Sequence, residues 1–364
     1  MIAAIVIPCL NEQASLLSAC KSLGFGTGSS SMPSDTYLCI VDNGSTDNTL
    51  TIAEQVQRAS PKGSVIIGHE PDRGYVPPRH HGNLLIKELA ITNGWDENEV
   101  LILQADADTY YSDGYVHNMR VAAIALPTGV VLEACSEYPT EFVMTHIQYI
   151  EMCRSVDHAI QHLLVATKYD VVVDDKVCAY RLGDYFKWGG HIREYTLAGE
   201  EIYAETTRLY LRAVSRHGCR YLVADAVAQH SVRKVLADPV LDFVTAGFPR
   251  EDSWRTEWHQ QYQGPIKLDE LYKATDNIEV QKAVAVRQLH ILALFGILPL
   301  HIANTLNLPV ENHITAFGYE MLSILPQRNR SLLLSQPGIF IMDVLSLLEY
   351  REDILLQYIA KQYN

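Results

Sequence analysis

Two aspartates close an apolar run in the first half of the chain. Asp106 and Asp108 follow Val100–Gln104 and are separated by one residue. Alternate residues of an extended chain point to the same side, so the two carboxylates can converge. Their repulsion is tolerable when a divalent cation lies beside them, and oxygen ligands suit Mg²⁺ or Mn²⁺. An Asp-x-Asp pair alone is a weak signal, and its surroundings decide what it means.

Polar residues also follow two earlier apolar runs. Ile2–Ile7 leads into the sequence Pro-Cys-Leu-Asn-Glu at residues 8–12, and Tyr37–Val41 leads into Asp-Asn-Gly-Ser-Thr-Asp-Asn at residues 42–48. Taken singly, Asn, Asp and Gly after a strand are ordinary turn formers. Three such endings in this order are more specific, and they favour a shared binding site.

An acidic pair stands further along the chain. Glu200 and Glu201 follow Gly199, and residues 199–218 have the spacing of a long amphipathic helix. The positive end of a helix favours ionised carboxylates, so either side chain could accept a proton at neutral pH. The alternative is simple charge complementarity at a helix start, and the sequence alone does not decide between the two.

The elements that must position these residues alternate between strand and helix patterns. Such alternation predicts an α/β fold with a mostly parallel sheet flanked by helices, and ligands then bind beyond the carboxyl ends of the strands. Asp47 and Ser112 are the predicted N-caps of two of the helices. The predicted strands are Ile2–Ile7, Tyr37–Val41, Val65–Ile67, Val100–Gln104, Val130–Ala134 and Tyr221–Ala224, and the predicted helices are Gln13–Leu23, Asn48–Ala59, Arg79–Asn93 and Asp113–Ala125.

The character of the sequence changes near residue 235. We expect an α/β domain over residues 1–235 and a helical C-terminal region over residues 236–364, which would shape the acceptor side or an oligomer interface. Helical spacing with Pro and Gly between the segments predicts three helices there. They are Asp276–Phe295, His313–Leu325 and Phe340–Tyr363.

Composition excludes several classes of protein. The chain has 364 residues, 48% hydrophobic and 20% charged, which is typical of a globular protein and argues against wholesale disorder. The net charge of −14 makes a nucleic-acid partner unexpected, because phosphate backbones attract basic surfaces. Seven scattered cysteines without a C-x-x-C pair fit a reducing cytoplasm.

We expect no signal peptide and no transmembrane segment in this sequence. The apolar start at residues 2–7 has no basic region before it and is interpreted as a buried strand instead of a signal peptide. Leu289–Leu306 contains His290, Pro299 and His301, which favours packed helices over a membrane span. Peripheral membrane contact and a homo-oligomer both stay open.

With these motifs together, the chain resembles the family 2 glycosyltransferases, which are inverting enzymes of the GT-A fold. The resemblance covers about residues 1–235 and is most specific in its first motifs and in the Asp-x-Asp pair. It rests on residues 6–12, residues 41–47, Arg79-x-x-Gly82 and Asp106-Ala107-Asp108, and continues with Tyr180-Arg181, Gly189-Gly190, Gly199-Glu200-Glu201 and His230-Ser231-x-Arg233.

The resemblance implies a role for each matching residue. Pro8, Leu10, Asn11 and Glu12 would border the base and ribose of a nucleotide sugar, and Asp42 would accept hydrogen bonds from the base. Arg79 would hold the diphosphate or the base, Asp106 would contact the ribose or a metal, and Asp108 would bind Mn²⁺ or Mg²⁺. His230 would be a further metal or diphosphate ligand, Arg233 would neutralise phosphate charge, and Glu201 would be the catalytic base with Glu200 as its competitor.

We therefore expect an enzyme that moves a sugar from a nucleotide-diphosphate sugar to an acceptor hydroxyl with inversion and with help from a metal. The alternative is a nucleotide-sugar-binding scaffold or partner protein without transfer activity. The presence of Asp108, Glu201 and His230 favours the enzyme. A nucleotidyltransferase is disfavoured because no Gly-rich, Lys-containing loop follows the first strand. Lipid, glycan, peptide and small-molecule acceptors all stay open, as do the donor sugar and its base.

Overall fold

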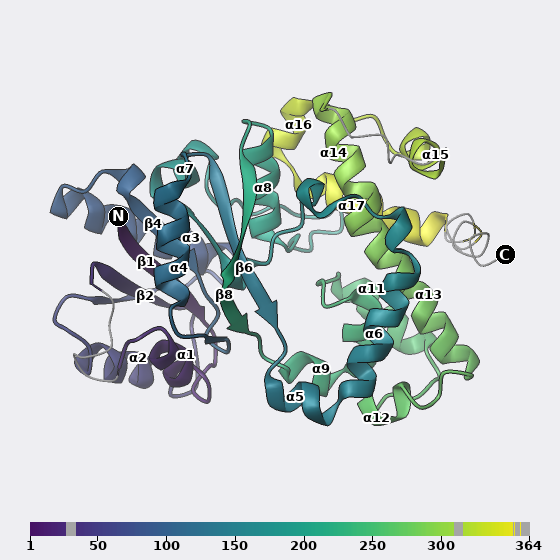
Figure 1. The fold of residues 1–364 in the computed structure, drawn as a ribbon, viewed down its shortest axis with the longest axis horizontal. Coiled ribbons are helices and arrows are strands. Elements are labelled where there is room, and N and C mark those ends of the chain that lie inside the picture. The colour runs from purple at the N-terminus through teal and green to yellow at the C-terminus, as the bar shows by residue number, and fades with distance from the viewer. Residues whose placement is uncertain (27–33, 309–315, 352, 354–356, 358–364) are drawn as a thin grey trace. The chain divides into compact units, whose positions relative to one another are not determined.

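The computed structural model describes residues 1–26, 34–308, 316–351, 353 and 357. The chain packs into two compact units (Figure 1). The first unit comprises residues 1–138, 173–195 and 204–231, and the second comprises residues 139–172, 196–203 and 232–364. The units are interleaved along the chain, since it leaves the first unit twice before residue 231. A single domain boundary at residue 235 stays a prediction.

The first unit contains one eight-stranded sheet in the order β3-β2-β1-β4-β7-β6-β8-β5. Neighbours among the first four strands are parallel, and β8 is parallel to β6. Antiparallel pairing joins β7 to β4 and β6, and β5 to β8. The strands are β1 Ile2–Cys9, β2 Thr36–Asp42, β3 Val65–His69, β4 Val100–Gln104, β5 Tyr110–Tyr111, β6 Val130–Glu137, β7 Cys178–Arg181 and β8 Cys219–Gln229.

Helices cover this sheet, which confirms the predicted α/β class. The helix α3 packs on β1 and β2, and α4 packs on β6 and β8. Coverage on both faces explains why β1, β2 and β4 are almost continuously apolar. The helices of the first unit are α1 Leu16–Ser22, α2 Thr49–Arg58, α3 Val76–Asn93, α4 Tyr115–Ala125, α7 Leu182–Lys187 and α8 Glu205–Val214.

Two predicted N-caps lie one or two residues away from the observed ones. The helix α2 begins at Thr49 after Asn48, and Asp47 still accepts a hydrogen bond from the Thr49 N–H at 2.9 Å. The helix α4 begins at Tyr115 after Gly114, with Ser112 further upstream. The predicted helix positions are therefore right to within a turn, and their caps are not.

The predicted helix over residues 199–218 is wrong at both ends. The structure has α8 at Glu205–Val214, preceded by a turn in which the Gly199 N–H donates to the Thr196 carbonyl. Gly199 (φ 85°) and Ala204 (φ 58°) are both left-handed, and a right-handed helix cannot run through them. Glu200 and Glu201 therefore do not open a helix.

The second unit is helical. The helices beyond residue 235 confirm the predicted helical C-terminal region. Of the helices predicted there, residues 313–315 and most residues after 351 lie outside the described part of the chain. The helices are α5 Thr140–Thr145, α6 Ile147–Ala159, α9 Arg233–Ala237, α10 Pro239–Thr245, α11 Asp252–Gln261, α12 Leu268–Leu271, α13 Ile278–Leu292, α14 Leu298–Leu306, α15 Ala316–Ile324, α16 Arg330–Ser335 and α17 Gly338–Tyr350.

One helix of the second unit has the length and composition of a membrane span. In the described part of the chain this holds for Ile278–Leu306, whose mean hydropathy is 1.7 over its most apolar window. A π-helical turn, Ala293–Ile297, joins α13 to α14 before Pro299, which cannot donate a helical hydrogen bond. The window is 78% buried inside the structure, and buried core helices show the same composition, so this is weak evidence for a span.

We predict that Gly82→Ala lowers the free energy of unfolding. Gly82 lies where α3 packs on the sheet, and an added Cβ would overlap Val6 and lie 3.2 Å from Val41. Overpacking costs about 1–3 kcal/mol, which outweighs the roughly 0.5–1 kcal/mol that Ala gains over Gly within a helix. Urea unfolding measures the difference.

Thr92→Ala is the matched control, since Thr92 is exposed on the same helix. Its free energy of unfolding is expected within about 0.5 kcal/mol of wild type. A Gly82→Ala protein as stable as this control would contradict the close packing of α3 on β1.

Candidate nucleotide-sugar site

Two polar loops at the carboxyl end of the sheet are tied together by hydrogen bonds. They follow the parallel neighbours β1 and β2, which pair Cys9 with Asp42. The Asn11 N–H donates to Ser45 Oγ at 3.0 Å, and the Thr46 N–H donates to Asn11 Oδ1 at 2.8 Å. Asn11 is left-handed (φ 58°), a conformation that Asn tolerates better than most residues. The two loops therefore form one structural unit.

The predicted base-binding residues lie on this pair of loops. Asp42 is buried at the end of β2, and its Oδ1 accepts from the Ser45 N–H at 3.3 Å. Leu10 is exposed (40%) and Pro8 is half-buried, so both can contact a ligand. The Glu12 N–H donates to Thr49 Oγ1 at 2.7 Å. These predicted residues lie on neighbouring strand ends, and their role in binding a base stays a prediction.

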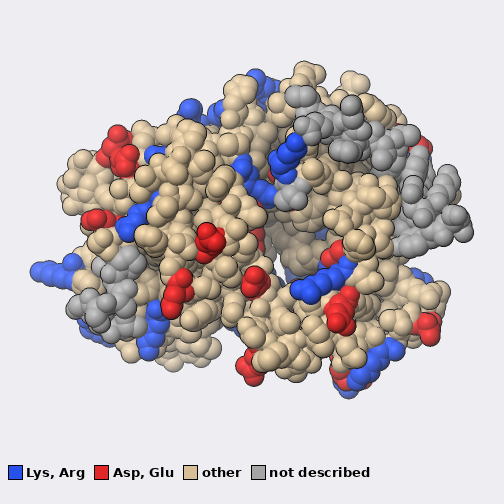
Figure 2. Space-filling view, in the orientation of Figure 1, with Lys and Arg blue, Asp and Glu red and all other residues tan. Residues whose placement is uncertain are grey.

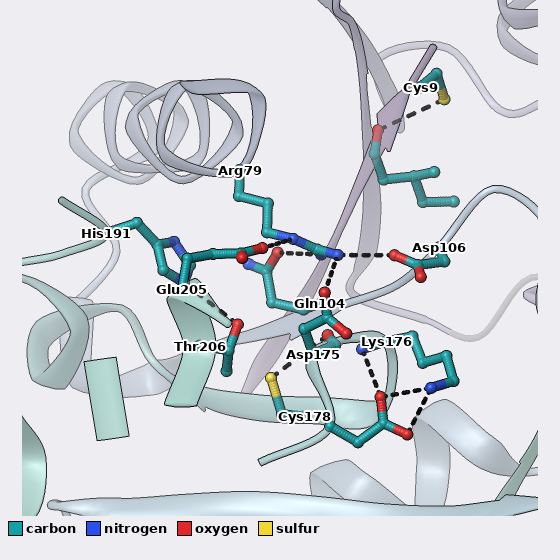
Figure 3. A network of polar contacts seen from close by, with 12 residues as sticks. Cys9, Arg79, Gln104, Asp106, Asp175, Lys176, Cys178, His191, Glu205 and Thr206 are labelled. Carbon is teal, nitrogen blue, oxygen red and sulfur yellow. Dashed lines mark hydrogen bonds and ion pairs between the residues drawn. The ribbon is translucent and has the colours of Figure 1, made fainter. Parts of the chain in front are cut away.

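A buried arginine lies at the centre of the neighbouring polar cluster (Figure 3). The Arg79 side chain is 5% exposed, and its Nη2 donates to Asp106 Oδ1 and to Asp175 Oδ2, each at 2.8 Å. Its Nε donates to Glu205 Oε1 at 2.8 Å, and its Nη1 to Gln104 Oε1 at 3.2 Å. One guanidinium thus holds three carboxylates.

Uncharged residues fix the rest of this cluster. The Gln104 side chain also donates to Asn83 Oδ1 (3.1 Å) and to the Tyr180 hydroxyl (2.8 Å), and all three residues are fully buried. The Tyr111 hydroxyl accepts from the Asp106 N–H at 2.9 Å and donates to the Lys176 carbonyl at 3.0 Å. The orientation of Arg79 and Asp106 is therefore determined from several sides.

Burial and mutual repulsion act on the carboxylates around Arg79. Burial raises the pKa of Glu205 to about 7 and that of Asp106 to about 6, although Arg79 opposes both shifts. Asp175 adds a further negative charge that raises both pKa values. Three carboxylates therefore compete for one guanidinium, and the cluster carries an excess of negative charge when all are ionised.

Asp108 and His230 lie beside this cluster. The His230 N–H donates to the Glu137 carbonyl at 3.0 Å, and its ring Nδ1 lies 3.1 Å from Ser136 Oγ. Burial and the charge of Lys176 lower the pKa of His230 to about 4, whereas Asp108 acts in the opposite direction. The imidazole is therefore neutral at neutral pH, which is the form that binds metals.

These residues fit a cation that takes part of its shell from a substrate. Within the described residues, no group of three or more His, Cys, Asp or Glu side chains could hold a metal ion. Asp106 has Oδ1 paired with Arg79, and it stays a predicted metal ligand through its other oxygen, together with Asp108 and the neutral His230. Mg²⁺ typically binds through one or two carboxylates with substrate phosphates and waters, so the donor set suits a diphosphate-bound cation.

Three predicted site residues belong to the second unit. Glu200 and Glu201 lie in the irregular segment 196–203, where the Glu200 N–H donates to Thr196 Oγ1 at 3.2 Å and Ser253 Oγ donates to Glu200 Oε2 at 3.4 Å. Arg233 is exposed and begins α9. The expected stabilisation of Glu200 and Glu201 by a helix start is wrong, because the acidic residue in the first turn of α8 is Glu205.

Sequence reasoning missed three members of the Arg79 cluster. Asp175 pairs with Arg79, and the neighbouring Asp174 pairs with Lys176 at 2.7 Å. Gln104 could have been assigned from the sequence, because a polar residue at the end of a buried strand needs a hydrogen-bond partner. Glu205 carried little local signal because its partner lies 126 residues away in the sequence.

Residues 4–148 match the family model described as glycosyl transferase family 2. They belong to that family. The matched region contains β1, β2, the Asp-x-Asp pair and Arg79, that is, most of the residues assembled at the carboxyl end of the sheet. The resemblance predicted from the motifs is confirmed for this glycosyltransferase region.

Solved glycosyltransferase structures are similar to this chain at low identity. S. aureus TarS 1-349 is 14% identical, with 97% of this chain and 92% of that chain covered and a TM-score of 0.44. The mannosyltransferase PcManGT from Pyrobaculum calidifontis, in complex with GDP-Man and Mn²⁺, is 14% identical over 95% and 86% of the two chains, with a TM-score of 0.45. Among curated proteins, none matches the chain.

We predict that Arg79→Met lowers the free energy of unfolding by about 3–5 kcal/mol, because removing one partner leaves buried carboxylates without a counter-charge. Arg58→Met is the control. Its side chain is 68% exposed, and its Nη1 lies 3.6 Å from Glu54 Oε2. Exposed ion pairs of this kind contribute about 0–1 kcal/mol to the free energy of unfolding. Chemical denaturation compares the two variants, and equal losses would show that the Arg79 cluster is not a buried charge centre.

Proposed function

We propose that this protein transfers a sugar from a nucleotide-diphosphate sugar to an acceptor hydroxyl with inversion, assisted by Mn²⁺ or Mg²⁺. The observation that carries the proposal is the convergence of three polar strand ends inside the family 2 glycosyltransferase region. The strand β1 pairs with β2 on one side and with β4 on the other, so the loops after all three lie at one edge of the sheet. Ligands of open α/β sheets bind at such edges.

The nucleotide would lie on the two tied loops after β1 and β2. Asp42 offers a carboxylate oxygen to a base N–H, and Pro8 and the exposed Leu10 offer apolar surface to the base and ribose. Asn11 and Glu12 border the same position. A buried acceptor that recognises a base N–H gives selectivity, because a ligand without that donor leaves the carboxylate unpaired.

Transfer requires a stabilised leaving group and a base for the acceptor. A bound divalent cation would supply positive charge to the departing diphosphate, with Asp108 and His230 as its protein ligands and Arg233 as a further cation. Glu201 would take the proton of the acceptor hydroxyl, with Glu200 as its competitor.

The proposal also covers the partners of the protein and its location in the cell. On the face drawn in Figure 2, basic and acidic side chains are dispersed among uncharged residues, a pattern that supports a small-molecule donor over a nucleic acid. We propose a cytoplasmic location from the scattered cysteines of the sequence. Peripheral membrane contact and a homo-oligomer remain compatible with this proposal.

The direct test is incubation of the protein with a panel of nucleotide sugars, Mn²⁺ and mixed acceptors, with release of nucleoside diphosphate as the readout. Release that depends on one donor and one acceptor class supports transfer. Tight donor binding without release from any pair would favour the non-catalytic binding protein. Binding of none of the donors would contradict the proposal.

We predict that Glu201→Gln lowers kcat by ~10²–10⁴-fold, the usual contribution of general-base catalysis, while donor affinity stays unchanged. The substitution keeps the size and hydrogen bonding of the side chain and removes its basicity. Steady-state kinetics and donor calorimetry provide the two readouts. Glu200→Gln is the matched control, and an inactive Glu200→Gln protein beside an active Glu201→Gln protein would reverse the two roles.

We predict that excess EDTA weakens binding of UDP or GDP, and that Mn²⁺ or Mg²⁺ restores it. A diphosphate beside Asp106 and Asp108 without a cation would place several negative charges close together, and the donor set of the site suits a cation shared with the diphosphate. Calorimetry with and without EDTA measures the effect. Tight binding that EDTA does not change would contradict a metal-assisted site.

A further inference from the structure

Arg79 joins three carboxylates from separate elements of the first unit (Figure 3). Asp106 follows the end of β4, Asp175 lies in a short 3-10 turn before β7, and Glu205 begins α8. Each accepts a hydrogen bond from the Arg79 guanidinium at 2.8 Å. Glu205 is 4% exposed, so its contact with Arg79 is part of the interior.

The geometry of Arg79 disfavours direct contact with a diphosphate. A guanidinium is planar and presents its N–H groups in a rigid fork, so it cannot turn one group toward a phosphate without moving the others. Turning it would break the pair with Glu205 and leave a buried carboxylate unpaired, which is costly. Gln104, fixed by Asn83 and Tyr180, holds the Nη1 end in place.

We propose that Glu205 is a positioning residue of the nucleotide-sugar site. It holds Arg79, and Arg79 holds Asp106 in the orientation in which that carboxylate meets the donor. Glu205 itself touches no substrate. The inference rests on the proposed function, in which the diphosphate of the donor lies beside Asp106 and Asp108, and it replaces the expected contact between Arg79 and the diphosphate.

Glu205 also lies close in sequence to Glu200 and Glu201, the two candidates for the catalytic base. One residue, Ala204, separates Glu205 from the segment 196–203, which contains Glu200 and Glu201, and this alanine is left-handed (φ 58°). Only a few non-glycine residues adopt this conformation, so the entry into α8 must be held by surrounding contacts. The pair of Glu205 with Arg79 anchors that entry point.

Glu205→Gln tests the proposal because two accounts of Arg79 predict opposite changes. If Glu205 positions Asp106 through Arg79, the variant binds UDP or GDP with Mn²⁺ about tenfold or more weakly, since a charge-assisted hydrogen bond is lost. Glu205→Asp keeps the charge and is expected to recover part of the affinity. If Arg79 contacts the diphosphate, Glu205→Gln releases the guanidinium, and unchanged or tighter binding would overturn the proposal.

The matched control is Glu194→Gln. Glu194 is also a buried glutamate of the first unit, 7% exposed, and accepts a hydrogen bond from Arg208 at 2.9 Å. It lies outside the Arg79 cluster. Its loss is expected to destabilise the protein and to leave nucleotide affinity unchanged, so an equal loss of affinity in both variants would reduce Glu205 to a stability role and overturn the proposal.

A second measurement needs no ligand. Asp106→Asn, Glu205→Gln and the double variant form a cycle of unfolding free energies, in which coupling through Arg79 makes the two changes non-additive. Additive changes would overturn the proposal whether or not a nucleotide binds. If the wild type binds neither UDP nor GDP but the cycle is non-additive, the donor assignment fails and the link from Glu205 to Asp106 through Arg79 stands.

Discussion

The arrangement of the candidate site depends on one buried guanidinium. Arg79 comes from the first turn of α3, and its partners come from β4, from the turn before β7 and from the start of α8. These elements are far apart in the sequence, and the Arg79 guanidinium joins them through charged hydrogen bonds. A buried arginine with three carboxylate partners is weak evidence for high stability, because desolvation offsets much of the attraction. It does hold Asp106, Asp175 and Glu205 around one group, and Asp106 is the first residue of the Asp-x-Asp pair.

The sheet brings the tied loops after β1 and β2 close to this guanidinium. The strand β1 lies between β2 and β4, so the loop with Leu10 and Asn11 lies between Asp42 on one side and Asp106 on the other. Close packing of α3 at Gly82 sets the depth at which Arg79 meets the end of β4. The same packing that builds the core therefore sets the geometry of the polar edge, which links the stability of the fold to the proposed chemistry.

Much of this edge could be predicted from the sequence. Apolar runs ending in polar residues located β1, β2 and β4, and with them Asp42, Asp106 and Asp108, because strand ends are local features. Glu205 and Asp175 could not be found in this way, since their partner Arg79 lies 126 and 96 residues away. The start of α8 was misplaced because a left-handed Ala204 contradicts the local preference of alanine. The interleaving of the two units through residues 139–172 also depends on tertiary packing that periodicity does not report.

The most direct test of this account is a crystal structure of the protein with a nucleoside diphosphate and Mn²⁺. The account predicts the base beside Asp42, the diphosphate and cation at Asp108 and His230, and an Arg79 guanidinium that still contacts both Asp106 and Glu205. A guanidinium that has left Glu205 to bind the diphosphate would contradict the positioning role. A nucleotide bound away from the carboxyl ends of β1, β2 and β4 would contradict the site itself.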